Sequence, residues 1–441
     1  MADKTADLAG PGIGNYDDLK KELPDDYEPL LTPMETMKAV FAIKTHIEEK
    51  LCKALNLQMV QVPLIVDRDS GVNDYLDRDG SRTPVEFPCG LGLDKPITAQ
   101  VVQAATKWKR MALKMFECQV GEGICTDMKA VRKDYFLDHD HSAYVDQWDW
   151  ERVISAGDRT LDFLKDVVTK IWKVIWESGQ MAQEMFPQLK SSKYPDIPEE
   201  LTFIHAEDML DMYPDLPRKQ RETYTLMEHA PALFIIGIGW PLKDGYPHEM
   251  RAADYDDWVT ETIVKNGEQY HGLNGDILVW NPVTRRRHEL TSMGIRVTKE
   301  TLKVQLKMSG QEDFLSLPYH QAVLNDEIPL SIGGGIGQAR TYMSLLRKAH
   351  PSLPLVILSH GDEMAALTIP NVSSYREVHE IIQRLVETYD VDFQVCGRFA
   401  AINNMDESDF PDFVHMIPSA PTALADYRDL GYELISIELT W

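Results

Sequence analysis

The length, composition and charge of this chain narrow the class of protein. With 441 residues, 44% of them hydrophobic, it is long enough for a large buried core and one to three domains. Its net charge of −25 would repel a polyanion, so we expect no nucleic acid among its partners. No run of about 18 apolar residues occurs, so we expect no membrane span.

Cysteine usage and the first residues indicate the compartment. The five cysteines are scattered, and no Cys-x-x-Cys pair is present, so we expect free thiols and no structural zinc. Residues 1–16 contain acids and glycines but no apolar core of a secretory signal. Free thiols are typical of a reducing compartment, and we therefore expect a cytoplasmic protein.

The chain begins with an arm and a well-marked helix. Residues 1–31 are rich in Asp, Gly and Pro and show no period, which is typical of an acidic arm. Thr32 can cap a helix, Pro33 suits its first position, and Glu35 can complete a capping box. Apolar residues at helical spacing follow, and residues 57–66 are strand-like.

Helical and strand patterns then alternate along the middle of the chain. Helices are predicted over residues 101–116, 152–185, 203–213 and 218–228. Strands are predicted over residues 123–132, 142–151, 232–240, 276–281 and 288–297. Strands joined by hairpins and loops, with helices between them, indicate an α+β domain with a mixed or mainly antiparallel sheet.

After residue 369 the pattern starts again. A helix (374–389), a strand (392–396), a helix (422–430) and a strand (433–439) predict a small appended α/β unit. We therefore expect an arm over residues 1–31, a core over 32–368 and an appended unit over 369–441.

A glycine-rich stretch, SIGGGIGQAR over residues 331–340, predicts a nucleotide site. Its glycines, Gly333, Gly334, Gly335 and Gly337, lack a Cβ, so a flat ring can lie close to the backbone. Arg340 on the following helix can meet phosphate with its planar set of donors. The stretch lacks the Gly-Lys-Ser/Thr ending of a P-loop and the spacing of a Rossmann fingerprint.

The segment YVDQWDWE over residues 144–151 predicts recognition of an amino acid. On a strand, Gln147 and Asp149 point to one side and Trp148 and Trp150 to the other. The tryptophans favour burial, which leaves the amide and the carboxylate facing a cavity. A carboxylate can bind an ammonium group and an amide can bind a carboxylate; an edge strand with a solvated polar face is the alternative.

Two further strands carry groups suited to a metal and a carboxylate. Asp276 and Glu289 open neighbouring strands, and two carboxylates placed in this way can hold Mg²⁺ beside nucleotide phosphates. Ser292 supplies a hydroxyl nearby, and Arg296 on the same strand can clamp a carboxylate. Taken singly, each of these charges is more typical of a solvated surface residue than of a binding site.

The order of these motifs resembles the core of class II aminoacyl-tRNA synthetases and, more narrowly, ammonia-dependent asparagine synthetases (aspartate–ammonia ligases). The resemblance covers roughly residues 34–366. The motifs that carry it are KWKR (107–110), GEG (121–123), residues 144–151, DYDDW (254–258), GLNGDILVWNP (272–282), SMGIR (292–296) and residues 333–340. The segment 355–364 stands where the family has a Trp-Pro ending.

The resemblance implies a function, a fold and a set of site residues. It implies ATP-dependent amidation of L-aspartate by ammonia through a β-aspartyl-adenylate, with AMP and pyrophosphate released. It also implies a mainly antiparallel sheet flanked by helices, Mg²⁺ at Asp276 and Glu289, and a homodimer. Arg132 would meet the α-phosphate and the substrate carboxylate, and Asp74 would lie beside the amidation point. Matching active-site positions are Lys109, Gln147, Asp149, Asp256, Arg296 and Arg340.

Two other functions fit parts of the sequence. One is a catalytically altered paralogue that binds ATP or an amino acid and acts as a regulator or scaffold through its C-terminal unit. The other is a tRNA-charging enzyme, which the negative charge and the lack of an anticodon-binding barrel before the core disfavour. Asparagine formation by the purified protein separates the first from an asparagine synthetase, and charging of tRNA would favour the second.

Overall fold

A computed structural model describes residues 27–74, 83–90, 92, 96–134, 142–191, 193–265, 267–348, 356–359, 361–389 and 391–429. The chain divides into two units, Met1–Pro351 and Ser352–Trp441. The second unit was expected to begin at residue 369, whereas in the structure it begins earlier. The reason is β14 (Val356–Ser359), which pairs in parallel with β15 (Asp392–Cys396).

An eight-stranded mixed sheet forms the centre of the first unit. Its strand order is β1-β5-β6-β13-β12-β11-β8-β7. The strands are β1 (Leu57–Met59), β5 (Gly123–Val131), β6 (Tyr144–Val153), β13 (Ser331–Gly337), β12 (Arg286–Ile295), β11 (Asn274–Asn281), β8 (Ala232–Ile236) and β7 (Thr202–His205). Only the outermost pairs, β1 with β5 and β7 with β8, are parallel. The prediction of a mainly antiparallel sheet is therefore confirmed.

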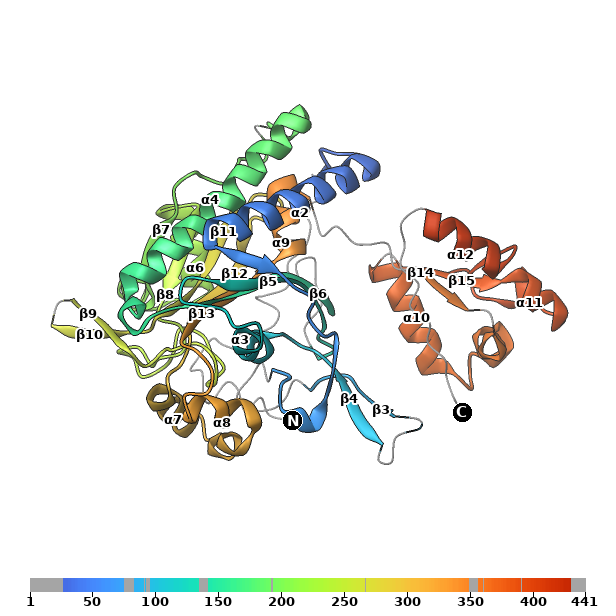
Figure 1. The fold of residues 1–441 in the computed structure, drawn as a ribbon. Coiled ribbons are helices and arrows are strands. Elements are labelled where there is room, and N and C mark those ends of the chain that lie inside the picture. The colour runs from blue at the N-terminus through green and yellow to red at the C-terminus, as the bar shows by residue number, and fades with distance from the viewer. Residues whose placement is uncertain are drawn as a thin grey trace. The chain divides into compact units, whose positions relative to one another are not determined.

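Three helices cover one face of this sheet: α2 (Pro33–Leu55), α4 (Leu161–Met185) and α9 (Gln338–Leu346), as Figure 1 shows. Trp148 and Trp150 of β6 are fully buried in the core beneath them. The opposite side of the sheet carries α3 (Thr106–Met115). The helices α7 (Lys299–Met308) and α8 (Pro318–Leu324) lie further from it. The alternation predicted for residues 144–151 thus holds, because the tryptophans face the helices.

The predicted start of the first long helix is also confirmed. Thr32 caps α2 by accepting a hydrogen bond from the Glu35 backbone N–H at 3.3 Å, and the Glu35 side chain accepts one from the Thr32 N–H at 2.9 Å. Pro33 occupies the first turn, where its missing N–H removes no helical hydrogen bond.

Four element predictions need correction. In three of them, the first residues of a predicted helix belong to a strand. Residues 97–101 form β4 (Ile97–Val101) between β2 (Ile65–Asp67) and β3 (Glu86–Cys89). The strand β6 continues to Val153, which pairs with Ser331, so α4 begins only at Leu161. Residues 202–205 pair with β8, and α5 (Ala206–Met212) follows. The strand predicted over residues 57–66 is two strands, with Pro63 between them; proline cannot donate to a strand ladder.

The first unit has two further elements. The strands β9 (Glu261–Lys265) and β10 (Glu268–His271) form a projecting hairpin, seen at the left of Figure 1. The helix α6 (Arg218–Glu228) contacts β11 and β12.

The second unit is a small parallel α/β arrangement. Its sheet has the order β14-β15-β16, with β16 at His415–Ile417, and all pairs are parallel. The helices are α10 (Arg376–Tyr389), α11 (Gly397–Ile402) and α12 (Ala420–Asp429). Val395 and Phe393 of β15 lie in its own hydrophobic core. The strand predicted over residues 433–439 and most of the N-terminal arm lie outside the described residues. The segment 355–364 contributes β14 to this sheet.

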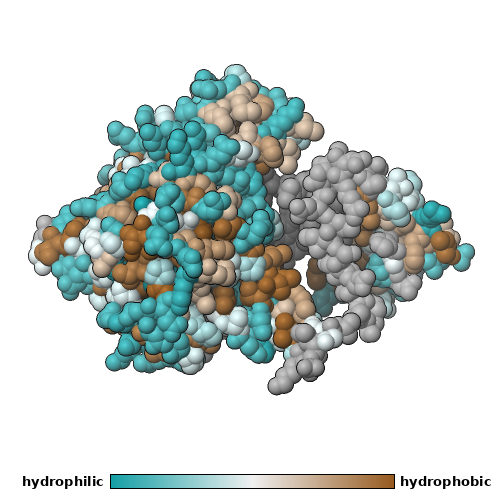
Figure 2. Space-filling model, in the orientation of Figure 1, coloured by the Kyte–Doolittle hydropathy of each residue, from teal (hydrophilic) through white to brown (hydrophobic). Residues whose placement is uncertain are grey.

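Hydrophilic residues dominate the visible surface of the first unit, and hydrophobic ones break it in patches (Figure 2). Within the described ranges, no helix combines the length and the apolar character that crossing a bilayer requires.

Candidate active site

A row of paired residues crosses the face of the sheet that lies opposite α2, α4 and α9. Asp276 on β11 pairs with Ser292 on β12, Ser292 pairs with Gly335 on β13, and Gly335 pairs with Asp149 on β6. Residues paired across strands project to the same face. The predicted metal-type carboxylate, the glycine stretch and the predicted amino-acid-binding carboxylate therefore share one face. Gln147 also lies on this face, opposite Gly337.

A second row lies two residues further along these strands. It runs from Asn274 through Gly294 and Gly333 to Glu151. Glu151 is fully buried and binds the Arg296 guanidinium, with 2.8 Å between Nη2 and Oε2 and 3.0 Å between Nε and Oε1. Burial alone would raise the pKa of Glu151, but the charge of Arg296 outweighs it and lowers that pKa. Glu151 was missed by the sequence analysis, although it continues the alternation of Gln147 and Asp149.

The glycines of β13 are required by their neighbours. A Cβ on Gly333 would lie 1.9 Å from Oε2 of Glu151, and one on Gly335 would lie 2.6 Å from Oε1 of Gln147. On the other face, a Cβ on Gly334 would lie 2.4 Å from the Cβ of Met293. Gly337 is different, because a Cβ on it would lie 3.5 Å from its nearest neighbour, the Leu290 carbonyl oxygen, which is an ordinary van der Waals distance. The first three glycines therefore allow polar side chains and the neighbouring strand to close over the ribbon.

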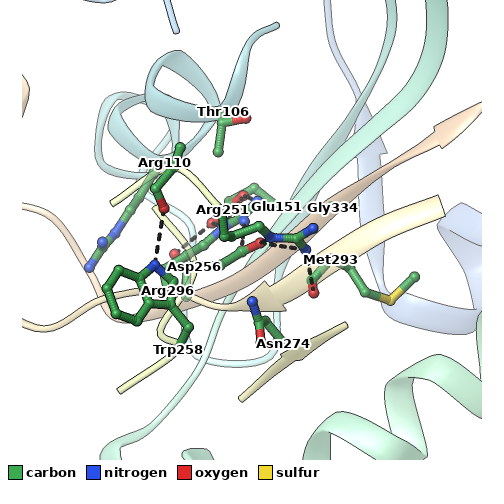
Figure 3. Close-up of polar contacts among 12 residues, drawn as sticks. Thr106, Arg110, Glu151, Arg251, Asp256, Trp258, Asn274, Met293, Arg296 and Gly334 are labelled. Carbon is green, nitrogen blue, oxygen red and sulfur yellow. Dashed lines mark hydrogen bonds and ion pairs between the residues drawn. The ribbon is translucent and has the colours of Figure 1, made fainter. Parts of the chain in front are cut away.

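Arg296, which directly follows β12, binds side chains from both β6 and the loop that carries Asp256. Besides Glu151, its Nη1 contacts Asp256, which is itself bound by Nε of Arg251 at 3.0 Å. Figure 3 shows Arg251, Asp256, Arg296 and Glu151 joined in one chain of ion pairs. The predicted site residues Asp256 and Arg296 are thus brought together. Arg251 was missed, because it lies in a loop without any period.

Lys109 and Asp149 form a buried pair at the centre of the site. Lys109 on α3 contacts the Asp149 carboxylate and donates to the carbonyls of Trp150 at 3.1 Å and Gly334 at 3.2 Å. The other carboxylate oxygen of Asp149, Oδ2, has no hydrogen-bond partner among the described residues. Burial raises the pKa of Asp149, although Lys109 opposes the rise. The arrangement leaves a buried acceptor oxygen suited to a cationic group.

Three carboxylates meet at the other end of the first row. Glu249, Asp276 and Glu289 each place an oxygen within 4.8 Å of the others. The register of β11 and β12 shifts between Ile277 and Leu278, and such a bulge re-aims side chains. Burial, reinforced by the neighbouring carboxylates, raises the pKa of Asp276 to about 7. Oxygen donors of this kind suit Mg²⁺. Glu249 was missed, since it lies in a loop far from both strands in sequence.

Cations surround this carboxylate cluster. Nη1 of Arg251 lies 2.9 Å from Asp276, and Nη1 of Arg340 lies 3.4 Å from Oε1 of Glu289. Lys219 of α6 contacts Glu249. Such a mixture of carboxylates and cations can hold a metal-bound phosphate chain.

Asp74 and Arg132 lie beside the N-terminus of α3. Asp74 is buried; its Oδ2 accepts from the Thr106 N–H at 2.7 Å, and its Oδ1 has no partner among the described residues. Burial raises its pKa to about 6. Arg132 follows β5, and its Nε donates to the carbonyl of Gln103 at 3.0 Å. The Gln103 amide in turn donates to the backbone carbonyl of Asp74 at 3.4 Å, so the two predicted residues are linked through Gln103.

The comparisons with known proteins agree with this geometry. The family model of aspartate-ammonia ligase matches residues 34–352. The aspartate--ammonia ligase of Bacteroides fragilis is 45% identical over 328 residues, which are 74% of this chain and 91% of the relative. The one from Lactiplantibacillus plantarum is 42% identical over 328 residues, covering 74% of this chain and 95% of the relative.

A solved structure supports the fold. The asparaginyl-tRNA synthetase of Pyrococcus horikoshii, complexed with asparaginyl-adenylate, superposes with a TM-score of 0.52. It is 14% identical, with 72% of this chain and 67% of that chain covered. The first unit therefore has a class II aminoacyl-tRNA synthetase-like fold, and the chain belongs to the aspartate–ammonia ligase family.

Proposed function

We propose that this protein makes L-asparagine from L-aspartate, ammonia and ATP, through a β-aspartyl-adenylate, and releases AMP and pyrophosphate. The observation that carries the proposal is the first row of the site. It places the carboxylate cluster around Asp276 on the same sheet face as Asp149, with Ser292 and Gly335 between them. A nucleotide and an acidic amino acid must lie side by side for adenylate formation, and one row offers groups for both.

Aspartate binds at the β6 end of the row. The free Oδ2 of Asp149 receives the α-ammonium group, and Gln147 offers its amide to a carboxylate. Lys109 and Arg296 supply positive charge for the substrate carboxylates. The contacts of Arg296 with Glu151 and Asp256 occupy only part of its five N–H donors, so donor capacity remains.

ATP binds at the other end of the row. Arg340 and Arg132 contact its phosphates, and the ribbon of β13 forms the floor beneath it. Glu249, Asp276 and Glu289 would hold Mg²⁺, since their oxygens meet within a single ion's reach. When bound there, Mg²⁺ would neutralise phosphate charge.

The two half-reactions place different demands on the residues. A carboxylate resists attack because its oxygens share a full negative charge, and transfer of AMP to the β-carboxylate of aspartate removes that charge and creates a leaving group. Arginine donors stabilise the charge that develops on the α-phosphate. In the second half-reaction Asp74 attracts ammonium and accepts its proton, so that neutral ammonia attacks the adenylate. Its unpartnered Oδ1 is available for this role.

We further propose that the protein is a cytoplasmic homodimer. The helix α2 exposes Met34, Met37 and Phe41, by 62%, 51% and 74%, at positions that share one side of a helix. The neighbouring strand β1 is an edge of the main sheet. Such an apolar stripe beside a sheet edge fits a symmetric interface in which the same patch occurs on both copies. All five cysteines are free, which supports a reducing compartment.

The decisive test is incubation with ATP, aspartate and ammonium. We expect asparagine, AMP and pyrophosphate in equal amounts. Formation of ADP would contradict the adenylate mechanism. Binding of ATP or aspartate without any asparagine would favour a catalytically altered paralogue. A parallel reaction with glutamine in place of ammonium determines the nitrogen donor.

A further inference from the structure

A buried set of ionisable groups lies next to Asp74 and has no part in the chemistry above. It consists of Lys107 on α3, Asp254 and His320 on α8. Lys107 and His320 are fully buried, and Asp254 is 3% exposed. Nζ of Lys107 lies 2.9 Å from Oδ2 of Asp254, and Nε2 of His320 lies 3.0 Å from the same oxygen. Burying three such groups is unfavourable unless each is paired.

Lys107 also contacts the segment that carries Asp74. Its Nζ donates to the backbone carbonyl of Asn73 at 3.3 Å. The Asn73 side chain is fixed as well, because it donates to the Val101 carbonyl at 3.2 Å and accepts from the Gln103 N–H at 3.0 Å. Asp74 then accepts from the Thr106 N–H, the residue next to Lys107. Asn73 and Asp74 are therefore held by the first residues of α3.

We propose that Lys107 is a positioning residue for the amidation step: its ammonium group ties the Asn73–Asp74 backbone to Asp254 and so holds the Asp74 carboxylate at the site. This inference rests on the proposed function. Asp254 gives Lys107 a fixed anchor, because its carboxylate is bound by His320 and its backbone carbonyl accepts a hydrogen bond from the Tyr319 hydroxyl at 3.1 Å.

The charges around Asp74 support this role. Burial raises the pKa of Asp74, Lys107 opposes the rise, and Asp254 and Asp149 add to it. Burial raises the pKa of the Tyr255 hydroxyl, and the negative charge of Asp74 adds to that rise. Burial would lower the pKa of Lys107, but Asp254 and Asp74 outweigh that effect and raise it, so the amine stays protonated. Lys107 is thus the one cation named here that favours the ionised form of Asp74.

The test separates the two half-reactions in the full-length enzyme. Aspartate-dependent exchange of labelled pyrophosphate into ATP measures adenylation, and asparagine formed per AMP released measures amidation. For Lys107→Met we expect exchange within about threefold of wild type, whereas asparagine per AMP falls about tenfold or more. The acid limb of the pH profile for asparagine formation should move up by about one pH unit, because removal of the cation raises the pKa of Asp74.

Two matched variants sharpen the result. Lys107→Arg retains the charge and should keep the acid limb near its wild-type position. Lys299→Met removes an exposed lysine paired with Asp326 on the surface and should change neither readout. If Lys107→Met does not fold, combining it with Asp254→Asn removes the buried negative charge that Lys107 no longer balances. The loss of asparagine per AMP should persist, because the donor to Asn73 is still absent.

The results that would contradict the positioning role of Lys107 differ from those that would contradict the proposed function. Unchanged coupling and an unmoved acid limb in a folded Lys107 variant would overturn the positioning role. Equal losses of exchange and asparagine formation would also overturn it, because they would indicate a general structural role. Absence of both reactions in the wild-type protein would instead refute the proposed function.

Discussion

Gly333 lies so close to Glu151 that a Cβ on the glycine would stand 1.9 Å from the Glu151 Oε2. The same Cβ would lie 2.6 Å from Nη2 of Arg296, the partner of that carboxylate. The glycine therefore protects an ion pair on which the site's geometry depends. Because both charges are buried, any displacement of one leaves the other without full compensation.

Gly333→Ala should destabilise the protein and reduce activity together. Overpacking of this kind costs about 1–3 kcal/mol, and here the added methyl would also separate Glu151 from Arg296. Denaturant unfolding and asparagine formation measure the two effects. Gly157→Ala is the matched control, because its Cβ would find its nearest neighbour at 3.6 Å. Wild-type stability and activity in Gly333→Ala would contradict the tight packing seen here.

Asp74→Asn should abolish amidation but leave adenylation. An amide cannot accept a proton from ammonium, whereas the first half-reaction does not use this side chain. We expect pyrophosphate exchange near the wild-type rate and a loss of asparagine of about a hundredfold or more. Equal losses in the two assays would argue against a role confined to ammonia.

The wild-type pH profile should reveal the same residue. Because burial raises the pKa of Asp74 to about 6, its carboxyl becomes protonated as the pH falls through that value. The amount of asparagine formed per AMP released, at saturating ammonium, should therefore decline below about pH 6. An acid limb near pH 4, the ordinary range of an aspartate, would contradict the raised pKa.

Arg132→Ala should abolish adenylation without unfolding the protein. The loss of a donor to the α-phosphate is expected to lower pyrophosphate exchange by about a hundredfold or more. Alanine removes the hydrogen bond from Arg132 to the Gln103 carbonyl, and we expect the circular dichroism spectrum to be unchanged. Arg398→Ala, an exposed position in the second unit, provides the control. An active, fully coupled Arg132→Ala enzyme would remove this arginine from the mechanism.

Glu249→Gln should raise the requirement for Mg²⁺. The amide keeps one oxygen but removes a negative charge from the cluster with Asp276 and Glu289. Titration of activity with Mg²⁺ should show half-saturation at a concentration about tenfold higher. Glu268→Gln, which changes an exposed carboxylate of β10, should leave the titration unchanged. The same curve for Glu249→Gln and wild type would exclude Glu249 as a ligand.

Phe41→Asp should convert the proposed dimer to monomers. A charge buried at a symmetric interface occurs twice, once from each copy, and has no partner there. Sedimentation velocity distinguishes the two states. Ile402→Asp is the control, since Ile402 is exposed by the same 74% but lies in the second unit. A wild-type protein that sediments as a monomer would refute the dimer itself.

Several parts of this protein follow from the sequence because they depend on neighbours along the chain. Thr32 and Glu35 lie three residues apart, and a capping box needs only that spacing. The opposite orientations of Asp149 and Trp150 follow from the pleat of a strand. Extending the same alternation by one step would have found Glu151. The long motifs around residues 272–282 and 333–340 carried the family resemblance, and hence the fold class.

The tertiary structure alone decided which distant residues meet. Glu249 joins Asp276 and Glu289 from a loop, and Arg251 joins Asp256 and Arg296, although neither loop residue shows a periodic pattern. The strand ends at residues 152–153 and 202–205 were equally hidden, because their conformation is set by the partners β13 and β8. Local patterns report the backbone's short-range preferences. Buried ion pairs and sheet register depend on strand order, which brings together groups that the chain itself keeps far apart.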